Sequence, residues 1–226
     1  MRLCKLILWD IRFQIKYGFY FLYFVLTIAY IFILSVLPEV WQENIAAILI
    51  FSDPAALGLF FMGAIILLEK SQRVPCALAV SPIKVSEYVL SKIVSLGTVS
   101  IGVAFIIAVS VGAKNLCWVA VGTILSGTIF TLLGIIVATK ISSLNQFVLW
   151  MVPIELIGFV PAILHLMKLS PALLRYYPAN VCVSMISGEA PAFGGLIVVI
   201  VLLAVLMYFS CRCVLKMWRR LGGIKL

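Results

Sequence analysis

Long runs of apolar residues with few charges recur along this sequence. A helix needs about 20 such residues to cross a hydrocarbon layer roughly 30 Å thick. Because the backbone finds no water in that layer, repeated crossings of this length are made as helices. We therefore expect an all-α polytopic membrane protein with six spans. The expected spans are Phe19–Leu37, Pro54–Leu68, Val89–Val111, Leu116–Val137, Phe147–Leu166 with interruptions at Pro153 and Pro161, and a last one from Leu196 through Phe209 toward Leu215.

The composition agrees with a membrane-embedded chain rather than a soluble domain. Hydrophobic residues make up 65% of the 226 residues and charged residues 11%, whereas soluble domains are about half apolar and about a quarter charged. The net charge of +9 does not indicate a nucleic-acid partner, because the basic residues lie between apolar runs. Anionic headgroups of membrane lipids are the expected partners of these cations.

Residues 1–17 form a cationic segment ahead of the first span. Its basic residues and one tryptophan recur at steps of three and four, which places them on one face of a helix. These residues are Arg2, Lys5, Trp9, Arg12 and Lys16. The pattern predicts an amphipathic helix lying in the membrane interface with its basic side toward the headgroups. A secretory signal peptide is disfavoured by Asp10 and by the absence of a small-x-small cleavage site.

The second span has two alternative descriptions. Asp53 followed by Pro54 is a strong helix-start signal, so we expect a span from Pro54 to Leu68. The short apolar run Ile45–Phe51, which follows a polar turn at Pro38, Glu39 and Glu43, would then dip into the outer leaflet. The alternative is one continuous helix from Ala46 that is kinked at Pro54.

The distribution of Lys and Arg predicts the orientation of the spans. With the N-terminus in the cytoplasm, six spans leave only Lys114, Lys168 and Arg175 outside, and place 14 of the 17 basic residues inside. This bias agrees with the positive-inside rule. Five or seven spans would put the basic C-terminal tail outside. We therefore predict a multi-pass protein of the plasma membrane with both termini in the cytoplasm.

No motif for catalysis, nucleotide binding or metal binding is found in the sequence. Nothing matches G-x-x-x-x-G-K-[ST], and the single histidine, His165, cannot supply an H-E-x-x-H site. Among the six cysteines, only Cys211 and Cys213 form a C-x-C pair, with no further ligands spaced for zinc. We expect no catalytic residue, no metal and no cofactor on this chain, and no enzymatic activity of its own.

The most polar internal segment, residues 69–86, follows the second expected span and is broken by Pro75 and Pro82. Together with the next few residues it resembles the corresponding loop of ABC-2 type permeases. That loop runs as Glu-Lys or Glu-Arg, a short helix ending at a proline, and then E-Y-x-L-x-K. The matching residues here are Glu69, Lys70, Pro82, Glu87, Tyr88, Leu90 and Lys92. Val74-Pro75 departs from the Gly-Thr that is common in such loops, and a solvated loop without a partner is the alternative.

In ABC-2 permeases this loop carries a coupling helix that docks into a groove of a separate ATPase subunit. The resemblance therefore implies an ABC ATPase as partner, which would bind the ATP and Mg²⁺. A short amphipathic segment suits a groove, because its apolar side chains enter while flanking charges fix the register. The residues expected to couple to the ATPase are Glu69, Lys70, Arg73, Ala77, Leu78, Pro82 and Glu87. We also expect Ser81-Pro82 to cap and start the next helix.

The resemblance extends over residues 1–226 as a single transmembrane domain. Family members share an interfacial helix, six spans and two short re-entrant helices in the last external loop, here residues 167–195. Two permease subunits, identical or related, are expected to enclose a central path. The stretches 9–14, 17–20 and 51–55 look like permeases described as fluoroquinolone exporters. The resemblance thus implies ATP-driven export of amphipathic, drug-like molecules, with lipid-like substrates as an alternative.

Two acidic residues lie at or within expected spans and are candidates for a substrate path. Asp53 has a helix cap as its alternative role, because Pro54 follows it. Glu155 lies inside the fifth span, where a carboxylate is costly and indicates a function or a polar partner. Its alternative is a position at a subunit interface or at a water-filled end of the bundle. The rival functions are an ATP-independent secondary transporter or channel, and a membrane anchor or assembly subunit.

Overall fold

The computed structural model describes residues 2–53, 57–113 and 115–221, and within these ranges the chain is helical with no strand. The fold class predicted from the apolar runs is confirmed as all-α. In chain order the elements are α1 (Arg2–Lys16), α2 (Phe19–Val36), α3 (Glu39–Ser52), α4 (Gly58–Ser71), α5 (Val74–Ala79), α6 (Val85–Ser110), α7 (Leu116–Lys140), α8 (Leu144–Leu166), η2 (Ala172–Tyr176), α9 (Pro178–Ile186) and α10 (Phe193–Leu221).

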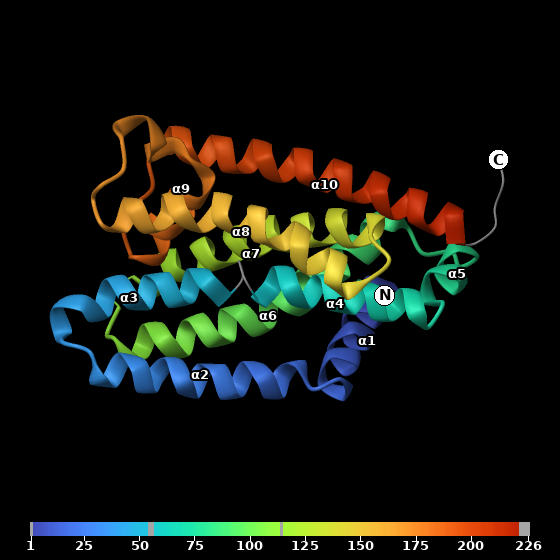
Figure 1. Ribbon diagram of the computed structural model, residues 1–226, viewed down its shortest axis with the longest axis horizontal. Helices are drawn as coiled ribbons and strands as arrows, with labels where there is room; N and C mark the ends of the chain where they lie inside the picture. The colour runs from blue at the N-terminus through green and yellow to red at the C-terminus, as the bar shows by residue number, and fades with distance from the viewer. Residues whose placement is uncertain (1, 54–56, 114, 222–226) are drawn as a thin grey trace.

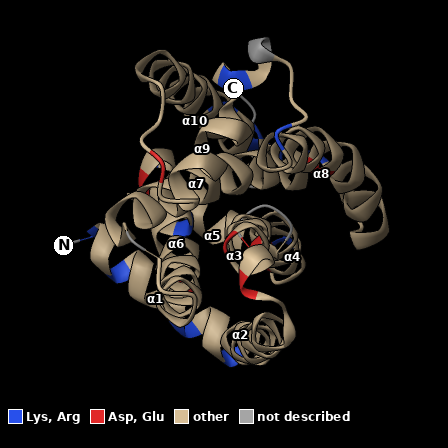
Figure 2. Ribbon diagram, turned by 90° about the vertical axis from the view of Figure 1, so that its left-hand side faces the viewer, with Lys and Arg blue, Asp and Glu red and all other residues tan. Residues whose placement is uncertain are grey.

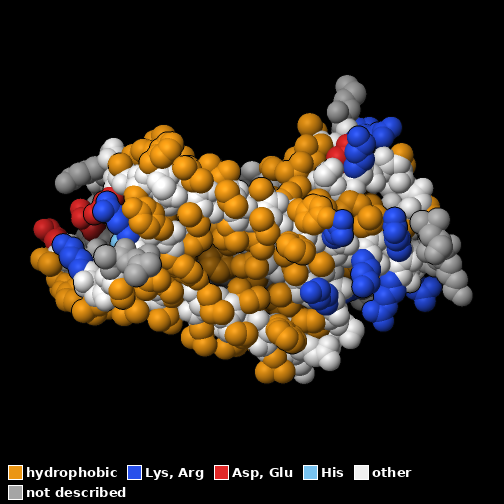
Figure 3. Space-filling view, turned by 90° about the horizontal axis from the view of Figure 1, so that it is seen from above, with side chains coloured by type: hydrophobic (Ala, Val, Ile, Leu, Met, Phe, Trp, Pro, Cys, Tyr) orange, Lys and Arg blue, Asp and Glu red, His pale blue; other side chains and the backbone are white. Residues whose placement is uncertain are grey.

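Five helices of the described residues are long and apolar enough to cross a membrane. These are α2, α6, α7, α8 and α10, and they run side by side along the length of the molecule (Figure 1). The middle of the surface seen in Figure 3 is a band of hydrophobic side chains, as a hydrocarbon environment requires. Most of the Lys and Arg side chains seen there gather at one end. The chain is thus a multi-pass, membrane-embedded protein.

Two ends of the bundle can be distinguished and are named here by their short helices. At the α5 end lie α1, α5 and the last turns of α10, whereas the α9 end holds α9, η2 and the connection from α2 to α3 (Figure 1). Figure 2 looks down the bundle from the α9 end and shows the long helices around α6 and α7.

α4 covers most of the second span expected over Pro54–Leu68, and the segment before it, expected only to dip into the outer leaflet, is the helix α3. α3 and α4 lie end to end, both in the side view and down the bundle (Figures 1 and 2). Of the polar turn expected at Pro38, Glu39 and Glu43, only Pro38 lies between α2 and α3, because α3 begins at Glu39 with Pro38 in the capping position. A glutamate in the first turn is favoured by the positive end of the helix dipole. The predicted start at Pro54 falls within 54–56, outside the described residues.

Two other expected helix boundaries are corrected by the structure. α8 was expected to be interrupted by its prolines, yet it continues through Pro153 and Pro161, as bundles tolerate when neighbouring groups satisfy the freed carbonyls. α6 does not begin at Ser81-Pro82 but at Val85. The reason is a carboxylate cap: the backbone N–H of Lys84 donates to Glu87 Oε2 at 2.9 Å.

The amphipathic character predicted for residues 1–17 is confirmed. The basic face of α1 is exposed, and the opposite face buries Asp10, Phe13 and Gln14. α1 lies at a steep angle to the long helices (Figure 1). The chain turns from α1 into α2 at Gly18, whose φ of 78° is in the left-handed region that favours glycine.

The segment 167–195 contains the two short helices η2 and α9. α9 is almost wholly buried, with seven of its nine residues inside the protein. Its approach to α7 is possible because Gly122 has no side chain: a Cβ there would lie 2.9 Å from the carbonyl oxygen of Cys182. The small residues of α7 therefore allow close packing of a helix that enters the bundle from the α9 end.

Candidate functional site

A buried cluster of three charged side chains joins α1, α4 and α6 at the α5 end. Lys92 forms ion pairs with Asp10 and with Glu69, and its Nζ lies 2.5 Å from Asp10 Oδ1. The three residues are 0–2% exposed. Since isolated charges are strongly disfavoured away from water, such groups are found buried only when they are paired. Asp10, Glu69 and Lys92 are called the ion cluster below.

Every carboxylate oxygen of the ion cluster accepts a hydrogen bond. Tyr88 Oη donates to Glu69 Oε2 at 2.5 Å, and Ser91 Oγ donates to Asp10 Oδ2 at 2.7 Å. The remaining oxygen of each acid accepts from the Lys92 ammonium. The Lys92 ammonium also lies 5.1 Å and 5.6 Å from the ring centres of Tyr88 and Trp9, within the range of cation–π attraction. A fully satisfied buried network of this kind fixes the relative positions of its helices.

The ion cluster lies where the segment that carries α5 leaves α4 and enters α6, while α5 itself packs against α4 and α10. Glu69 is two residues before the end of α4 and Lys92 is in the second turn of α6, so the cluster holds together the two ends of the segment that carries α5. α1 and the residue after it are also hydrogen-bonded to this segment. The Arg2 guanidinium donates to the Pro82 carbonyl at 3.1 Å, and Gln72 donates to Tyr17 Oη. The segment that carries α5 is therefore linked to α1, α4 and α6, and α5 itself to α4 and α10.

α5 presents one face outward and packs with the other. Pro75 is buried, and the Cys76 thiol donates to the Leu221 carbonyl of α10 at 3.3 Å. On the outer side, Arg73 and Ala77 are exposed and Leu78 is half-buried. The short helix predicted within residues 69–86 is thus present over Val74–Ala79, in spite of the Val74-Pro75 sequence at its start.

The sequence-predicted coupling residues fall into two groups. Arg73, Ala77 and Pro82 are exposed on or beside α5, and Leu78 is half-buried there. Glu69, Lys70 and Glu87 instead have partners within the chain: the ion cluster, the end of α7 and the cap of α6. The Lys70 ammonium donates to the carbonyls of Ala138, Thr139 and Ile141 at 2.6, 3.0 and 2.7 Å. It thereby satisfies carbonyls that a helix end leaves without partners.

Asp53 follows the last residue of α3, Glu155 lies on α8, and no hydrogen bond joins them among the described residues. Asp53 is 1% exposed, and neither of its carboxylate oxygens accepts a hydrogen bond from the described residues. The expected capping interaction of Asp53 is therefore not seen within the described part of the chain. Glu155 lies on α8, and its Oε1 is likewise buried without a partner among the described residues.

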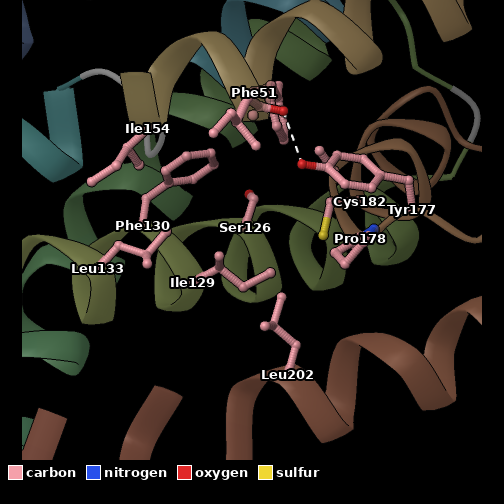
Figure 4. Close-up of a pocket in the computed structure, with 13 residues that line it drawn as sticks. Phe51, Ser126, Ile129, Phe130, Leu133, Ile154, Tyr177, Pro178, Cys182 and Leu202 are labelled. Carbon is pink, nitrogen blue, oxygen red and sulfur yellow. Dashed lines mark hydrogen bonds between the residues drawn. The ribbon is translucent and has the colours of Figure 1, made fainter. Parts of the chain in front are cut away.

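An apolar cavity of about 350 Å³ lies between α3, α7, α8, α9 and α10 (Figure 4). Aromatic and aliphatic side chains line most of it. The lining includes Phe51, Ile129, Phe130, Ile154, Cys182 and Leu202. The polar groups at its wall are already engaged, since Tyr177 Oη donates to the Ile157 carbonyl at 2.9 Å and Ser126 Oγ donates to the Gly122 carbonyl at 2.9 Å. Such a cavity suits an apolar molecule or the apolar part of an amphipathic one.

Sequence reasoning did not find the ion cluster or the apolar cavity. The signals for the cluster were present: Asp10 is the one acid in residues 1–17, and Lys92 stands in an otherwise apolar run. An aspartate or a lysine does not by itself show which residue it will pair with, because the ion-pair partner lies on another helix. The cavity left no signal, because its wall is assembled from five elements. Comparison of the chain with protein-family models and with curated protein sequences gave no match.

Proposed function

We propose that this chain is the permease subunit of an ATP-driven exporter of the ABC-2 type. The observation that carries the proposal is α5, a short helix with an exposed outer face, in a segment whose two ends the ion cluster joins to each other and to α1. A surface that receives force from a partner needs two properties: it must be accessible, and it must be joined stiffly to the elements that move. The segment around α5 has both.

Exposure at α5 supports docking of a separate subunit. Val80, directly after α5, is 79% exposed, and Ala77 faces outward beside Arg73. A small apolar patch flanked by a cation is the usual form of a short helix that enters a groove. The partner in this proposal is an ABC ATPase that binds ATP and Mg²⁺, since the chain itself carries no nucleotide-binding motif.

The ion cluster supports the transmission of movement. Removing one member of a buried ion pair commonly costs ~3–5 kcal/mol, so α1, α4 and α6 do not separate easily at this point. A push on α5 would accordingly tilt α1, α4 and α6 together. In this role Glu69 positions the docking segment, and it does not touch the ATPase.

The cationic α5 end supports the proposed orientation. We place this end in the cytoplasm of a plasma-membrane protein, with α3 and α4 together forming a sixth crossing and both termini inside. Most Lys and Arg side chains on the face seen in Figure 3 lie at that end, which agrees with the positive-inside rule. A second permease subunit, identical or related, would complete the path across the membrane.

The apolar cavity supports a substrate of amphipathic character. Its volume of about 350 Å³ lies at the lower end of the range of small-molecule pockets, roughly 300–1,000 Å³. We propose that drug-like or lipid-like molecules enter it by their apolar portion.

An ATP-independent secondary transporter is the second candidate, and Asp53 is the observation that favours it. A carboxylate buried at the middle of a broken membrane helix, without a partner among the described residues, is typical of ion- or proton-coupled sites.

Affinity purification of the tagged chain from its native membrane, with mass spectrometry of the proteins that accompany it, distinguishes the two candidates. The pump predicts recovery of a P-loop subunit, and the Ala77→Asp variant should lose it. Val40→Asp is the matched control, because Val40 is 85% exposed at the opposite end of the bundle. Recovery of the chain alone, under conditions that preserve a known ABC pump of the same membrane, would instead support the secondary transporter.

A further inference from the structure

A second cavity, of about 420 Å³, lies at the α5 end between the ends of α4, α7 and α10. Three of its lining residues are the cations Lys70, Lys140 and Arg220, and none of the described residues that line it is acidic. It is separate from the apolar cavity and from the outer face of α5. We call it the basic cavity.

The three cations of the basic cavity are not neutralised by carboxylates. Within residues 2–53, 57–113 and 115–221, the ion pairs are those of Lys92 alone. The Lys70 ammonium is held in the wall by three carbonyl oxygens, while Lys140 and Arg220 are exposed beside it. Like charges that surround one cavity repel each other, so an anion bound there is stabilised by all three.

The chemistry of the wall selects among anions. Apolar side chains stand next to the cations, namely Leu67, Ile141, Met217 and Leu221. The cavity lies where membrane-crossing helices end, at the level of the lipid headgroups. A phosphodiester attached to acyl chains matches both the cations and the apolar side chains of this wall. Basic pockets between helices at the membrane surface accommodate anionic headgroups.

We infer that the basic cavity binds the phosphate group of an anionic phospholipid. Lys140 and Arg220 contact the phosphate, Lys70 contributes its fixed charge, and the apolar residues receive the start of the acyl chains. The bound lipid joins the ends of α4, α7 and α10. It also lies next to α5, because Cys76 of α5 is hydrogen-bonded to Leu221. The inference requires the membrane location of this end and not the presence of an ATPase.

Lipid binding to the purified chain in a neutral detergent tests the inference. The probes are phosphatidylglycerol and phosphatidylcholine of identical acyl chains, and the readout is the dissociation constant from native mass spectrometry. The Lys140→Gln/Arg220→Gln variant should bind phosphatidylglycerol roughly 10- to 30-fold more weakly, with phosphatidylcholine unchanged. Lys216→Gln/Arg219→Gln is the matched control, since it removes the same charge from exposed positions of α10 that do not line the cavity.

Equal weakening by both double variants would overturn the inference, because it would show diffuse attraction to a basic surface. Displacement of phosphatidylglycerol by millimolar inorganic phosphate would also overturn it, because the site would then hold a soluble anion. Lys140→Arg/Arg220→Lys keeps both charges and should keep the binding. If that variant loses binding while its elution on size exclusion is unchanged, charge is not what holds the lipid and the inference fails.

Discussion

Replacement of Lys92 by methionine removes the ammonium that two buried carboxylates share. Methionine has a similar length and apolar character, so the change deletes the charge without opening a large cavity. Asp10 and Glu69 are then left facing each other with one hydrogen bond each, from Ser91 and Tyr88. Loss of one partner of a buried pair costs ~3–5 kcal/mol, and the repulsion of two carboxylates adds to it.

This cost should be visible in thermal unfolding. For a chain of this length, 1 kcal/mol corresponds to roughly 2–4 °C in Tm, so Lys92→Met should lower Tm by roughly 6–20 °C. The assay is unfolding of the detergent-purified protein in which the other five cysteines are replaced by serine, followed by a thiol-reactive dye that then reports only the buried Cys182. Lys216→Met is the control, because Lys216 is exposed and such changes stay within about ±0.5 kcal/mol.

A second substitution identifies the cause of the loss. Asp10→Asn on the Lys92→Met background removes one of the two facing carboxylates, so it should recover part of the lost Tm. Asp10→Asn alone should lower Tm, because it weakens an ion pair that is present. If Lys92→Met and Lys216→Met shift Tm equally, or if Asp10→Asn lowers Tm on both backgrounds alike, the ion cluster does not hold α1, α4 and α6 together.

Three further predictions concern packing and the cavity. Tyr88→Phe leaves a buried carboxylate oxygen without its donor and should reduce the free energy of unfolding by about 1–3 kcal/mol, measured by denaturant titration in mixed micelles. Gly63→Ala places a Cβ 2.1 Å from Phe147 Cζ and should lower the free energy of unfolding by about 1–3 kcal/mol in the same titration. Gly97→Ala is the control: its Cβ meets nothing within 4 Å, so the substitution should be neutral or stabilising. Leu202→Trp fills the apolar cavity and should abolish the saturable binding of an environment-sensitive apolar dye; unchanged binding would place the dye elsewhere on the protein.

Several features were predictable because they depend on local patterns. The long helices follow from apolar runs of sufficient length, and the exposed basic face of α1 follows from a spacing of three and four residues. The short helix α5 lies in the segment where resemblance to a coupling loop placed it. Gly63 and Gly122 lie at close contacts between helices, as glycines of membrane helices commonly do.

Helix boundaries were less predictable, because they depend on which of several signals prevails. Ser81-Pro82 and Lys84–Glu87 both carry start signals for α6, and the carboxylate cap at Glu87 decides the outcome. At Pro153 the local signal favours a break, yet α8 continues because the packed bundle compensates for a missing N–H.

Apolar runs and charge spacing are properties of neighbouring residues, and they are enough to make this chain an all-helical protein of the membrane with a cationic end. The ion cluster is of another kind: Asp10 and Lys92 are 82 residues apart, and Glu69 and Lys92 are 23 apart. No local sequence pattern predicts which lysine will pair with a given acidic residue, because the pairing depends on how α1 crosses the ends of α4 and α6. The two cavities likewise arise where several helices leave space between them. Their positions are therefore set by packing among distant segments, and only the folded arrangement decides them.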